Sequence, residues 1–354
     1  MAIAITERDL YFLETRNHIL LTADIGGTHV RHRISDLNGN QVSSGKLETN
    51  NYDNPISLVN DILRANDQHK NVAAVAFGIA GPCNKDAEEV DIINSKMRKI
   101  NLREIFDHLS NSGILAFAYL NDLEAQTWGI LAGGNNSVDL SSSHQLSDPS
   151  NYQLAVIAPG TGLGVGNGFI EDGKITVRQS EGGHSLSLSL DDLKMFEELK
   201  DFIEAKTGWD LEAEDVISGR GLENLLAFFV HKYELGRGNP VQYTADQIVK
   251  FAKENKFPST GVMQVYIELL GEFARNLALT FNADRVTLVG HCHKEVDFYQ
   301  KDDRFMTAFI ENARLKEQLR RVRVDIMEPD GLGERGAATY LQQKIIEPRM
   351  TGTL

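Results

Sequence analysis

Two hydrophobic patterns alternate along the chain. Short apolar runs of strand length are separated by stretches in which apolar residues recur at helical spacing. This alternation is typical of an α/β protein with parallel strands. Strands are predicted at residues 18–24, 72–79, 113–120, 152–158, 285–289 and 322–327. Helices are predicted at residues 55–67, 102–109, 190–205, 221–233, 245–254, 262–281 and 333–344.

A strand followed by a glycine-rich turn and a hairpin occurs twice. The first strand ends in Asp24 and leads into Gly26-Gly27-Thr28, and the second leads into Gly160-Thr161-Gly162. Each hairpin has an Asn-Gly or Asp-Gly pair at its own turn, and such pairs suit tight turns. The recurrence predicts a duplicated fold with a ligand between its halves. Residues 133–150, which are rich in Gly, Asn and Ser, are predicted to form a surface loop or a domain junction.

The composition excludes several classes of protein. A chain of 354 residues with 42% hydrophobic side chains buries a large core and is expected to form about two domains. The net charge of −14 argues against a nucleic-acid partner, which would require clustered Lys and Arg. No membrane partner is expected, because the apolar runs are far shorter than the roughly 20 residues that span a bilayer. Cys83 and Cys292 are the only cysteines, which fits a reducing compartment and leaves no disulfide framework or four-cysteine zinc site.

The two glycine-rich turns are candidates for phosphate binding. Glycine lacks a Cβ and tolerates positive φ, so its backbone amide can approach a phosphate closely. Plain hairpin turns are the alternative, although the presence of two favours a binding function. The run that begins at Gly160 lacks the spacing of a dinucleotide-binding turn and leads into a hairpin where that motif needs a helix. The Gly-x4-Gly-Lys pattern at residues 168–174 is a coincidence, because Ile175 replaces the magnesium-binding Ser or Thr.

Asn121 and Asp122 follow a predicted strand and begin a helical stretch. The amides and dipole of a helix N-terminus favour an ionised carboxylate, which can accept a proton. A simple N-cap is the alternative interpretation. Loops after strand ends are where α/β sheets hold ligands, so Asp122 is a candidate base.

Glu181 and His184 flank a Gly-Gly pair and suit the hydroxyl groups of a polyhydroxylated ligand. A structural loop and a metal site are the alternatives, although the local sequence supplies no further metal ligands. His291-Cys292-His293 has metal-binding residue types, but its two histidines point the same way only on a regular strand. A metal site is therefore disfavoured at both places.

Six segments, taken in order, resemble those of bacterial-type glucokinases, which belong to the actin/hexokinase/Hsp70 superfamily. The resemblance covers residues 19–343, nearly the whole chain. The segment from Asp24 to Thr28 is similar to the family's first phosphate motif, and residues 158–164 are similar to its second. Residues 78–82 with 93–95 resemble the sugar-side loop, residues 120–125 the catalytic segment, and residues 181–184 and 213–219 two sugar-binding segments.

The resemblance implies transfer of the γ-phosphoryl group of ATP to the 6-hydroxyl of glucose or a similar hexose. Asp122 then accepts the hydroxyl proton, and Asp24 lies near Mg²⁺, which it binds through water. The residues that contact the sugar are Asn94, Asn121, Asp122, Glu181, His184 and Glu214. The residues that hold the nucleotide are Asp24, Gly26, Gly27, Thr28, Gly160, Thr161, Gly162 and Gly290.

The resemblance also implies a two-domain α/β structure with the actin-like ATPase (ribonuclease H-like) fold and an interdomain cleft. A small α/β domain is expected at residues 1–131, with the C-terminal helix 334–354 packed back on it. A large α/β domain is expected at residues 132–333. The family further implies a cytoplasmic homodimer that acts in glycolysis.

Three positions depart from the family pattern. His29 stands where Asn usually follows Gly-Gly-Thr, Gly290-His291 replaces a Gly-Gly pair, and Met97 lies near the place of a usual Trp. Two alternatives therefore stay open: a non-catalytic sugar sensor with a weakened nucleotide site, and a kinase that uses another hexose or phosphoryl donor. The related repressor/kinase family is disfavoured, because two isolated cysteines cannot form its zinc motif.

Overall fold

The structure of the protein is a computed structural model. The residues that it describes are 19–65, 71–81, 83–84, 88–92, 95–133, 136–141, 146, 148–185, 188–236, 241–290, 296–311 and 313–346. They divide into two units. Unit 1 comprises Met1–Gly134, Gly173–Gln179 and Pro329–Leu354, and unit 2 comprises Asn135–Asp172 and Ser180–Glu328. In the described ranges no helix is both long and apolar enough to cross a membrane.

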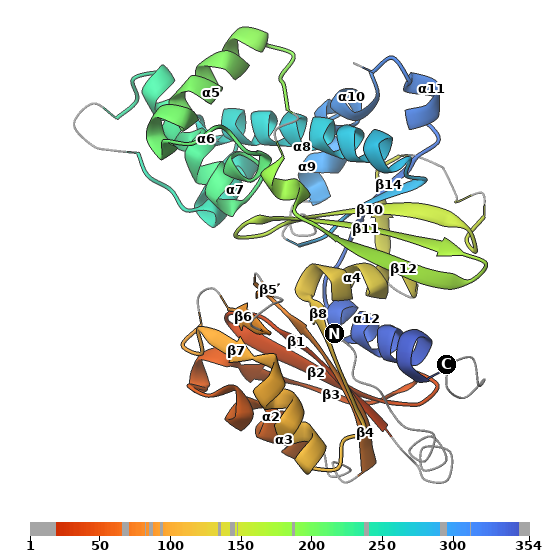
Figure 1. The fold of residues 1–354 in the computed structure, drawn as a ribbon. Helices are drawn as coiled ribbons and strands as arrows, with labels where there is room; N and C mark the ends of the chain where they lie inside the picture. The colour runs from red at the N-terminus through yellow and green to blue at the C-terminus, as the bar shows by residue number, and fades with distance from the viewer. Residues whose placement is uncertain are drawn as a thin grey trace. The chain divides into compact units, whose positions relative to one another are not determined.

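Unit 1 contains a five-stranded sheet with the strand order β3-β2-β1-β4-β8 (Figure 1). Its strands are β1 (Ile19–Ile25), β2 (His29–Asp36), β3 (Gln41–Glu48), β4 (Val72–Ile79) and β8 (Ala116–Asn121). The strands β1, β4 and β8 run parallel, whereas β2 and β3 pair antiparallel. The other elements are η1 (Thr49–Asn51), α2 (Pro55–Arg64), α3 (Leu102–Asn111), α4 (Asp122–Leu131), α12 (Leu332–Leu341), the π-helical segment η6 (Gln342–Ile346), and a small sheet of β5 (Cys83–Asn84), β6 (Glu89–Asp91) and β7 (Lys99–Asn101).

The alternation of side chains along β1 gives this sheet two different faces. Leu21, Ala23 and Ile25 pack in one apolar cluster with residues of α2 and α3. Thr22 and Asp24 alternate with them and therefore face the other side, where α12 and α4 contact the sheet. Polar groups at the end of β1 are thus directed to the α4 and α12 side.

Asparagine caps explain where three helices of unit 1 begin. The Asn54 side chain accepts a hydrogen bond from the Ile56 amide, and Pro55 occupies the first helical position of α2. Asn101 caps α3 and Asn121 caps α4 in the same way. Each cap satisfies an amide that has no partner within its helix, so these asparagines define the helix starts.

Glycines allow α4 and α12 to touch through their backbones. A Cβ on Gly336 of α12 would lie 1.7 Å from the Ala125 carbonyl oxygen of α4. A Cβ on Gly129 of α4 would lie 2.1 Å from the Leu332 carbonyl oxygen of α12. Neither site has room for a side chain, so the two glycines determine how closely the helices pack.

Unit 2 is built on a second sheet, with the strand order β12-β11-β10-β13-β14-β9. Its strands are β9 (Ser137–Asp139), β10 (Tyr152–Pro159), β11 (Leu163–Glu171), β12 (Lys174–Ser180), β13 (Arg285–Leu288) and β14 (Arg323–Met327), and residues 173–179 of β12 are grouped with unit 1. The helices are η3 (Gly182–His184), α5 (Leu193–Thr207), η4 (Ala213–Asp215), α6 (Gly219–Lys232), α7 (Ala245–Lys253), α8 (Ser259–Phe281), α9 (Val296–Lys301), α10 (Arg304–Ile310) and α11 (Lys316–Leu319).

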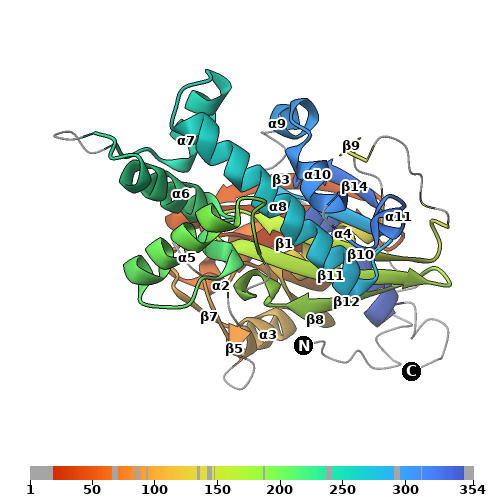
Figure 2. The same ribbon diagram turned by 90° about the horizontal axis from the view of Figure 1, so that it is seen from above.

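The long helix α8 lies at the centre of the helical layer of unit 2. It contacts α6 and α7 and also α10, and Figure 2 shows it running between these groups. Its buried residues, such as Met263, Leu270 and Phe273, belong to the same apolar cluster as β10 and β13. Gly271 lets α10 approach, since a Cβ there would be 2.4 Å from the Phe305 carbonyl oxygen. The core of unit 2 therefore lies around α8.

Most of the predicted pattern is confirmed. Each predicted strand and helix is present with shifted ends, and both sheets contain a hairpin followed by parallel strands, as the recurrent motif indicated. The stretch 133–150, expected to be a surface loop or a domain junction, contains the strand β9, which pairs with β14. The boundary between the two units falls within this stretch, between Gly134 and Asn135. The short helices α9, α10 and α11 were not predicted, since each is too short to display a clear helical period.

Substitution of Gly336 tests the close contact between α4 and α12. Alanine favours helix over glycine by about 1 kcal/mol, so Gly336→Ala would stabilise an uncrowded helix. Because the new Cβ collides with a backbone oxygen, we expect a loss of about 1–3 kcal/mol in the free energy of unfolding. Urea denaturation followed by circular dichroism measures this. A variant as stable as the parent protein would contradict the contact.

Candidate active site

The first glycine-rich turn joins β1 to β2 and is held from two sides. The Gly26 amide donates to the His29 carbonyl oxygen at 3.0 Å. Thr49 of η1 donates twice, from its amide to the Thr28 carbonyl oxygen at 2.9 Å and from its hydroxyl to the Gly26 carbonyl oxygen at 2.8 Å. The Thr28 residue itself is exposed. The turn is therefore a fixed, exposed loop of the kind that binds anions through its backbone.

Asp24 lies next to this turn and close to the start of α12. A Cβ on Gly333 would be 3.0 Å from Oδ2 of Asp24, so the carboxylate lies directly against the helix backbone. Burial, followed by the charges of Glu334 and Asp122, raises the pKa of Asp24 to about 8, although Arg31 opposes this. The carboxylates of α4 and α12 thus both act on Asp24 of β1 within unit 1.

Asp122 is the first residue of α4, directly after β8. Oδ1 of Asn121 and Oδ1 of Asp122 both accept from the Leu123 amide, at 3.1 and 2.9 Å. Burial raises the pKa of Asp122. β8 lies beside β4, and a Cβ on Gly78 of β4 would lie 3.9 Å from both the Asp122 Cα and the Ala23 carbonyl oxygen. The strand order therefore brings Asp122 close to the end of β1 and to Asp24.

Glu334 adds an unpredicted carboxylate to this region. Its residue is only 6% exposed, and its Oε2 is buried without a hydrogen-bond partner. Within the described residues no three His, Cys, Asp or Glu side chains are placed to hold a metal ion together. A magnesium ion in nucleotide sites usually keeps several waters and needs only one or two carboxylates. Asp24 and the unpaired oxygen of Glu334 fit a hydrated ion of this kind.

The second glycine-rich turn joins β10 to β11 in unit 2. The Gly160 amide donates to the Gly162 carbonyl oxygen at 2.8 Å, and the Gly219 amide donates to the Gly160 carbonyl oxygen at 2.8 Å. The N-terminus of α6 therefore lies against the turn, where the helix dipole favours an anion. Gly290 has φ +77° and packs against Pro159. A Cβ on Gly290 would lie 2.6 Å from the Pro159 carbonyl oxygen. The predicted nucleotide-binding glycines of unit 2 are thus neighbours.

The glycines of the two turns differ in how much they are needed for space. Gly26, Gly160 and Gly162 lie outside the left-handed region, and a Cβ on Gly160 would meet only an ordinary contact at 3.9 Å. Gly162, in contrast, has no room for a side chain, because a Cβ there would lie 2.5 Å from Oε2 of Glu214. The turn is therefore packed against a predicted sugar-binding residue.

Glu181, His184 and Glu214 come together in unit 2. Oε2 of Glu214 accepts from the Leu163 amide at 2.8 Å, and its other oxygen pairs with Arg220. Glu181 and Glu214 both contribute to the raised pKa of His184, after the larger effect of the hydrogen bond that the ring donates to Glu212. The predicted sugar-binding residues and the second glycine-rich turn are therefore neighbours through Glu214.

The site residues expected from the sequence are divided between the two units, and two of the residues discussed lie outside the described ranges. Asn121, Asp122 and the first turn belong to unit 1, whereas Glu181, His184, Glu214, Gly290 and the second turn belong to unit 2. Asn94 and His291 are outside the described residues.

Sequence reasoning missed Glu212, Arg220 and Glu334 as members of these clusters. Only Glu212 had a visible signal, since it stands two residues before Glu214.

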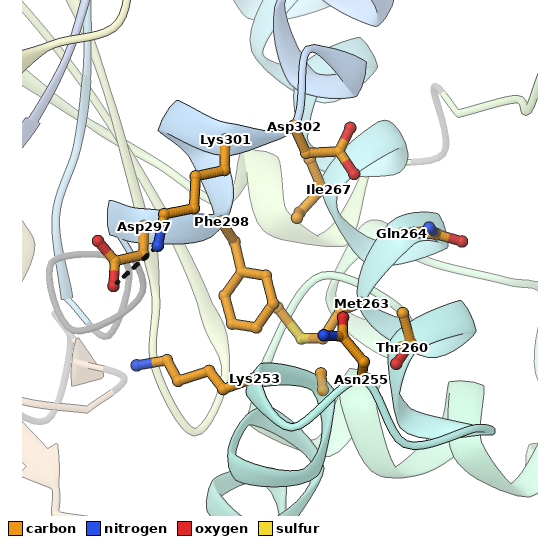
Figure 3. Close-up of a pocket in the computed structure, with 11 residues that line it drawn as sticks. Lys253, Asn255, Thr260, Met263, Gln264, Ile267, Asp297, Phe298, Lys301 and Asp302 are labelled. Atoms are coloured by element: carbon orange, nitrogen blue, oxygen red, sulfur yellow. Dashed lines mark ion pairs between the residues drawn. The ribbon is translucent and has the colours of Figure 1, made fainter.

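A cavity of about 470 Å³ lies among α7, α8 and α9 of unit 2 (Figure 3). The Phe298 ring lies beside Met263, the Lys253 ammonium is 6.0 Å from the ring centroid, and Lys301 pairs with Asp297 at 3.8 Å. None of the site residues expected from the sequence lines this cavity. The clusters around Asp122 and His184 therefore remain the candidate active site.

Comparison with known proteins identifies the family of this chain. A family model described as glucokinase matches residues 21–344. The chain belongs to the glucokinase family. It is 26% identical to the glucokinase of Colwellia psychrerythraea over 333 residues, which cover 92% of this chain and 96% of that protein.

Solved glucokinase structures share the fold of this family member. A glucokinase from an Antarctic psychrotroph matches with a TM-score of 0.78 at 21% identity, covering 93% of this chain and 100% of that chain. The glucokinase of Balamuthia mandrillaris in complex with glucose matches with a TM-score of 0.70 at 20% identity, covering 94% of this chain and 98% of that chain. The mixed α/β, two-unit architecture is therefore that of glucokinases.

Glu214 is expected to support the local structure as well as any ligand. Removing its carboxylate in Glu214→Ala leaves the Leu163 amide without its acceptor, which costs about 1–3 kcal/mol of unfolding free energy. Glu214→Gln keeps an acceptor oxygen and should lose clearly less. Urea denaturation of both variants measures the difference. Equal losses in the two variants would show that the hydrogen bond to Leu163 does not matter.

Proposed function

We propose that this chain transfers the γ-phosphoryl group of ATP to the 6-hydroxyl of glucose. The observation that carries the proposal is Asp122, a buried carboxylate at the start of α4 that lies near Asp24 and has a raised pKa. Membership of the glucokinase family supports the same reaction, as does the glucose in the Balamuthia mandrillaris complex. The proposal assigns each unit one part of the chemistry.

In this proposal the units form an actin-like ATPase fold whose interdomain cleft receives both substrates. The phosphates of ATP bind to the turns at residues 26–28 and 160–162, which are fixed by hydrogen bonds and supported by the N-terminus of α6. Asp24 holds the magnesium ion that accompanies ATP, through water, and the ion neutralises phosphate charge. The fixed turns supply alignment, which is the main requirement of phosphoryl transfer.

Asp122 is the proposed general base. The 6-hydroxyl oxygen attacks the γ-phosphorus while the bond to the β-phosphate oxygen breaks, and the hydroxyl proton passes to the Asp122 carboxylate. Burial raises the pKa of Asp122, so its carboxylate is a better proton acceptor than an exposed aspartate. Asn121 and Leu123 help to orient it, because its Oδ1 accepts from the Leu123 amide, which Asn121 also caps.

The sugar is proposed to bind through Asn94, Asn121, Glu181, His184 and Glu214. Carboxylates accept hydrogen bonds from hydroxyl groups, whereas amide and imidazole groups can both donate to hydroxyl groups and accept from them. A sugar without the matching hydroxyl leaves such groups unpaired, which makes a site of this kind selective. Glucose is therefore proposed as the preferred hexose. The family also leads us to propose a cytoplasmic homodimer that acts in glycolysis.

A sugar sensor without kinase activity is the second candidate. His29, which follows the first glycine-rich turn, pairs with Glu48 at a distance of 3.2 Å between Nε2 and Oε1. An imidazole at this position changes the immediate surroundings of the proposed phosphate site. Calorimetry with glucose and with ATP-magnesium, followed by a coupled kinase assay, separates the candidates: a sensor binds glucose but forms no phosphorylated sugar. A panel of hexoses and of phosphoryl donors tests substrate choice.

Replacement of Asp122 tests its proposed role. Asp122→Asn keeps the shape of the side chain but cannot accept the proton, so we expect turnover to fall by roughly 10²-fold or more. Glucose affinity should remain within about tenfold, because binding does not need the proton transfer. Asp246→Asn, at the equivalent first turn of α7, is the matched control and should be fully active. Unchanged turnover in Asp122→Asn would remove the residue from this role.

The pH dependence of the rate follows from the raised pKa of Asp122. The base works only when ionised, so kcat/KM should fall as the pH drops through this pKa. Because burial raises that pKa, the acidic limb of the profile should lie above the ordinary range of an aspartate, which is about pH 4. A coupled assay between pH 4.5 and 9 gives the profile. A rate that stays constant down to the ordinary aspartate range would contradict the assignment.

A further inference from the structure

Glu212 makes a short side-chain contact with His184 of the proposed sugar-binding cluster. Its Oε2 lies 2.6 Å from Nδ1 of His184, although the two residues are 28 positions apart in the chain. His184 ends η3, and Glu212 immediately precedes η4, so the hydrogen bond joins two separate elements. A contact of this length between an imidazole and a carboxylate is a strong, charge-assisted hydrogen bond.

Local hydrogen bonds of their own segments fix the backbones of both Glu212 and His184. The Glu212 amide donates to Oδ2 of Asp215 at 3.1 Å, and the Asp215 amide donates to the Glu212 carbonyl oxygen at 3.1 Å. The His184 amide donates to the Glu181 carbonyl oxygen at 3.0 Å. Gly183 packs so tightly on β11 that a Cβ would lie 2.0 Å from the Leu163 carbonyl oxygen. The geometry of the pair is therefore built into the fold.

The carboxylate determines which ring nitrogen carries a proton. An ionised Glu212 can only accept, so Nδ1 of His184 must be the donor. The Nε2 atom is then left for a ligand: it accepts a hydrogen bond when the ring is neutral and donates one when the ring is protonated. The His184 side chain is 52% exposed and that of Glu212 is 44% exposed, so the ring is accessible to a small molecule.

The charges that face His184 all come from acidic residues. The hydrogen bond and charge of Glu212, with smaller effects from Glu214 and Glu181, raise the pKa of His184, while burial opposes them. Glu214 is also paired with Arg220, which reduces its influence. Glu212 is therefore the residue that mainly determines whether this ring is charged near neutral pH.

We propose that Glu212 is a positioning residue for sugar binding: it orients His184 through Nδ1 and keeps the ring cationic, so that Nε2 donates a charge-assisted hydrogen bond to a glucose hydroxyl. The inference rests on the proposed function, because it assumes that His184 contacts the sugar. It adds a residue to the site and makes glucose affinity depend on pH. The bond is strongest below the pKa of His184 and weakens as the pH rises through that value.

The test compares Glu212→Gln with the parent protein. Glutamine keeps an acceptor for Nδ1 but removes the charge, so the pKa of His184 should fall toward or below its ordinary value. Calorimetric titration with glucose at pH 7.5 should then give a dissociation constant about fivefold to tenfold higher, the difference between charge-assisted and neutral hydrogen bonds. At pH 5.5, where the ring is protonated in both proteins, the two constants should converge.

Measurement of kcat distinguishes a positioning role of Glu212 from a catalytic one. Glu212→Gln should change kcat by less than about twofold at saturating glucose, because Glu212 does not touch the reacting atoms. Glu223→Gln, at an exposed glutamate of α6, is the matched control and should match the parent protein at every pH. A loss of glucose affinity that is equal at pH 5.5 and 7.5 would indicate a merely structural role and would overturn the proposal.

Histidine NMR distinguishes failure of this inference from failure of the proposed function. Titration of the His184 ring signals requires no substrate and should give a higher pKa in the parent protein than in Glu212→Gln. An identical titration in the two proteins would overturn the role of Glu212, even if glucose is phosphorylated. A parent protein that phosphorylates no sugar but shows the expected NMR shift would instead defeat the proposed function.

Discussion

The removal of three carboxylates from water is the physical constraint on which the proposed chemistry of unit 1 depends. Asp24, Asp122 and Glu334 come from β1, α4 and α12, and burial raises the pKa of each. Arg31 offsets part of the negative charge at Asp24 and at Glu334. Such an arrangement favours groups that bring positive charge or a proton, which are a magnesium ion at Asp24 and a hydroxyl proton at Asp122. The close packing of α4 on α12 through Gly129 and Gly336 holds the carboxylates in this arrangement.

Unit 2 couples its two proposed binding functions through one side chain. Glu214 packs against Gly162, accepts from the Leu163 amide and lies near His184. The turn proposed for phosphate and the segment proposed for sugar thus share a residue, so a change at one alters the other. The N-terminus of α6 adjoins the same turn through Gly219 and Gly160. This compactness explains why a few short segments of the sequence contain most of the candidate chemistry.

The sequence predicted the central elements well because their signals are local. Strands such as β4 and β10 are continuous apolar runs, and Asn121 marks the start of α4 by its capping role alone. The strand β9 was missed because three residues in a polar stretch carry no periodicity, and its pairing with β14 depends on distant residues. Glu212 and Glu334 were missed for the same reason: their partners, His184 and Asp24, are far away in the chain. The close contact between Gly162 and Glu214 was not predicted either, because the two residues are far apart in the chain.

Phosphorus NMR of a mixture of this protein, ATP-magnesium and glucose tests the central claim most directly, because it identifies both products without a coupling enzyme. The account predicts a sugar phosphate ester on the 6-carbon of glucose, formed in the same amount as ADP. Inorganic phosphate in place of the ester, or bound glucose with ATP left intact, would contradict the assignment of Asp122 and the two glycine-rich turns to phosphoryl transfer.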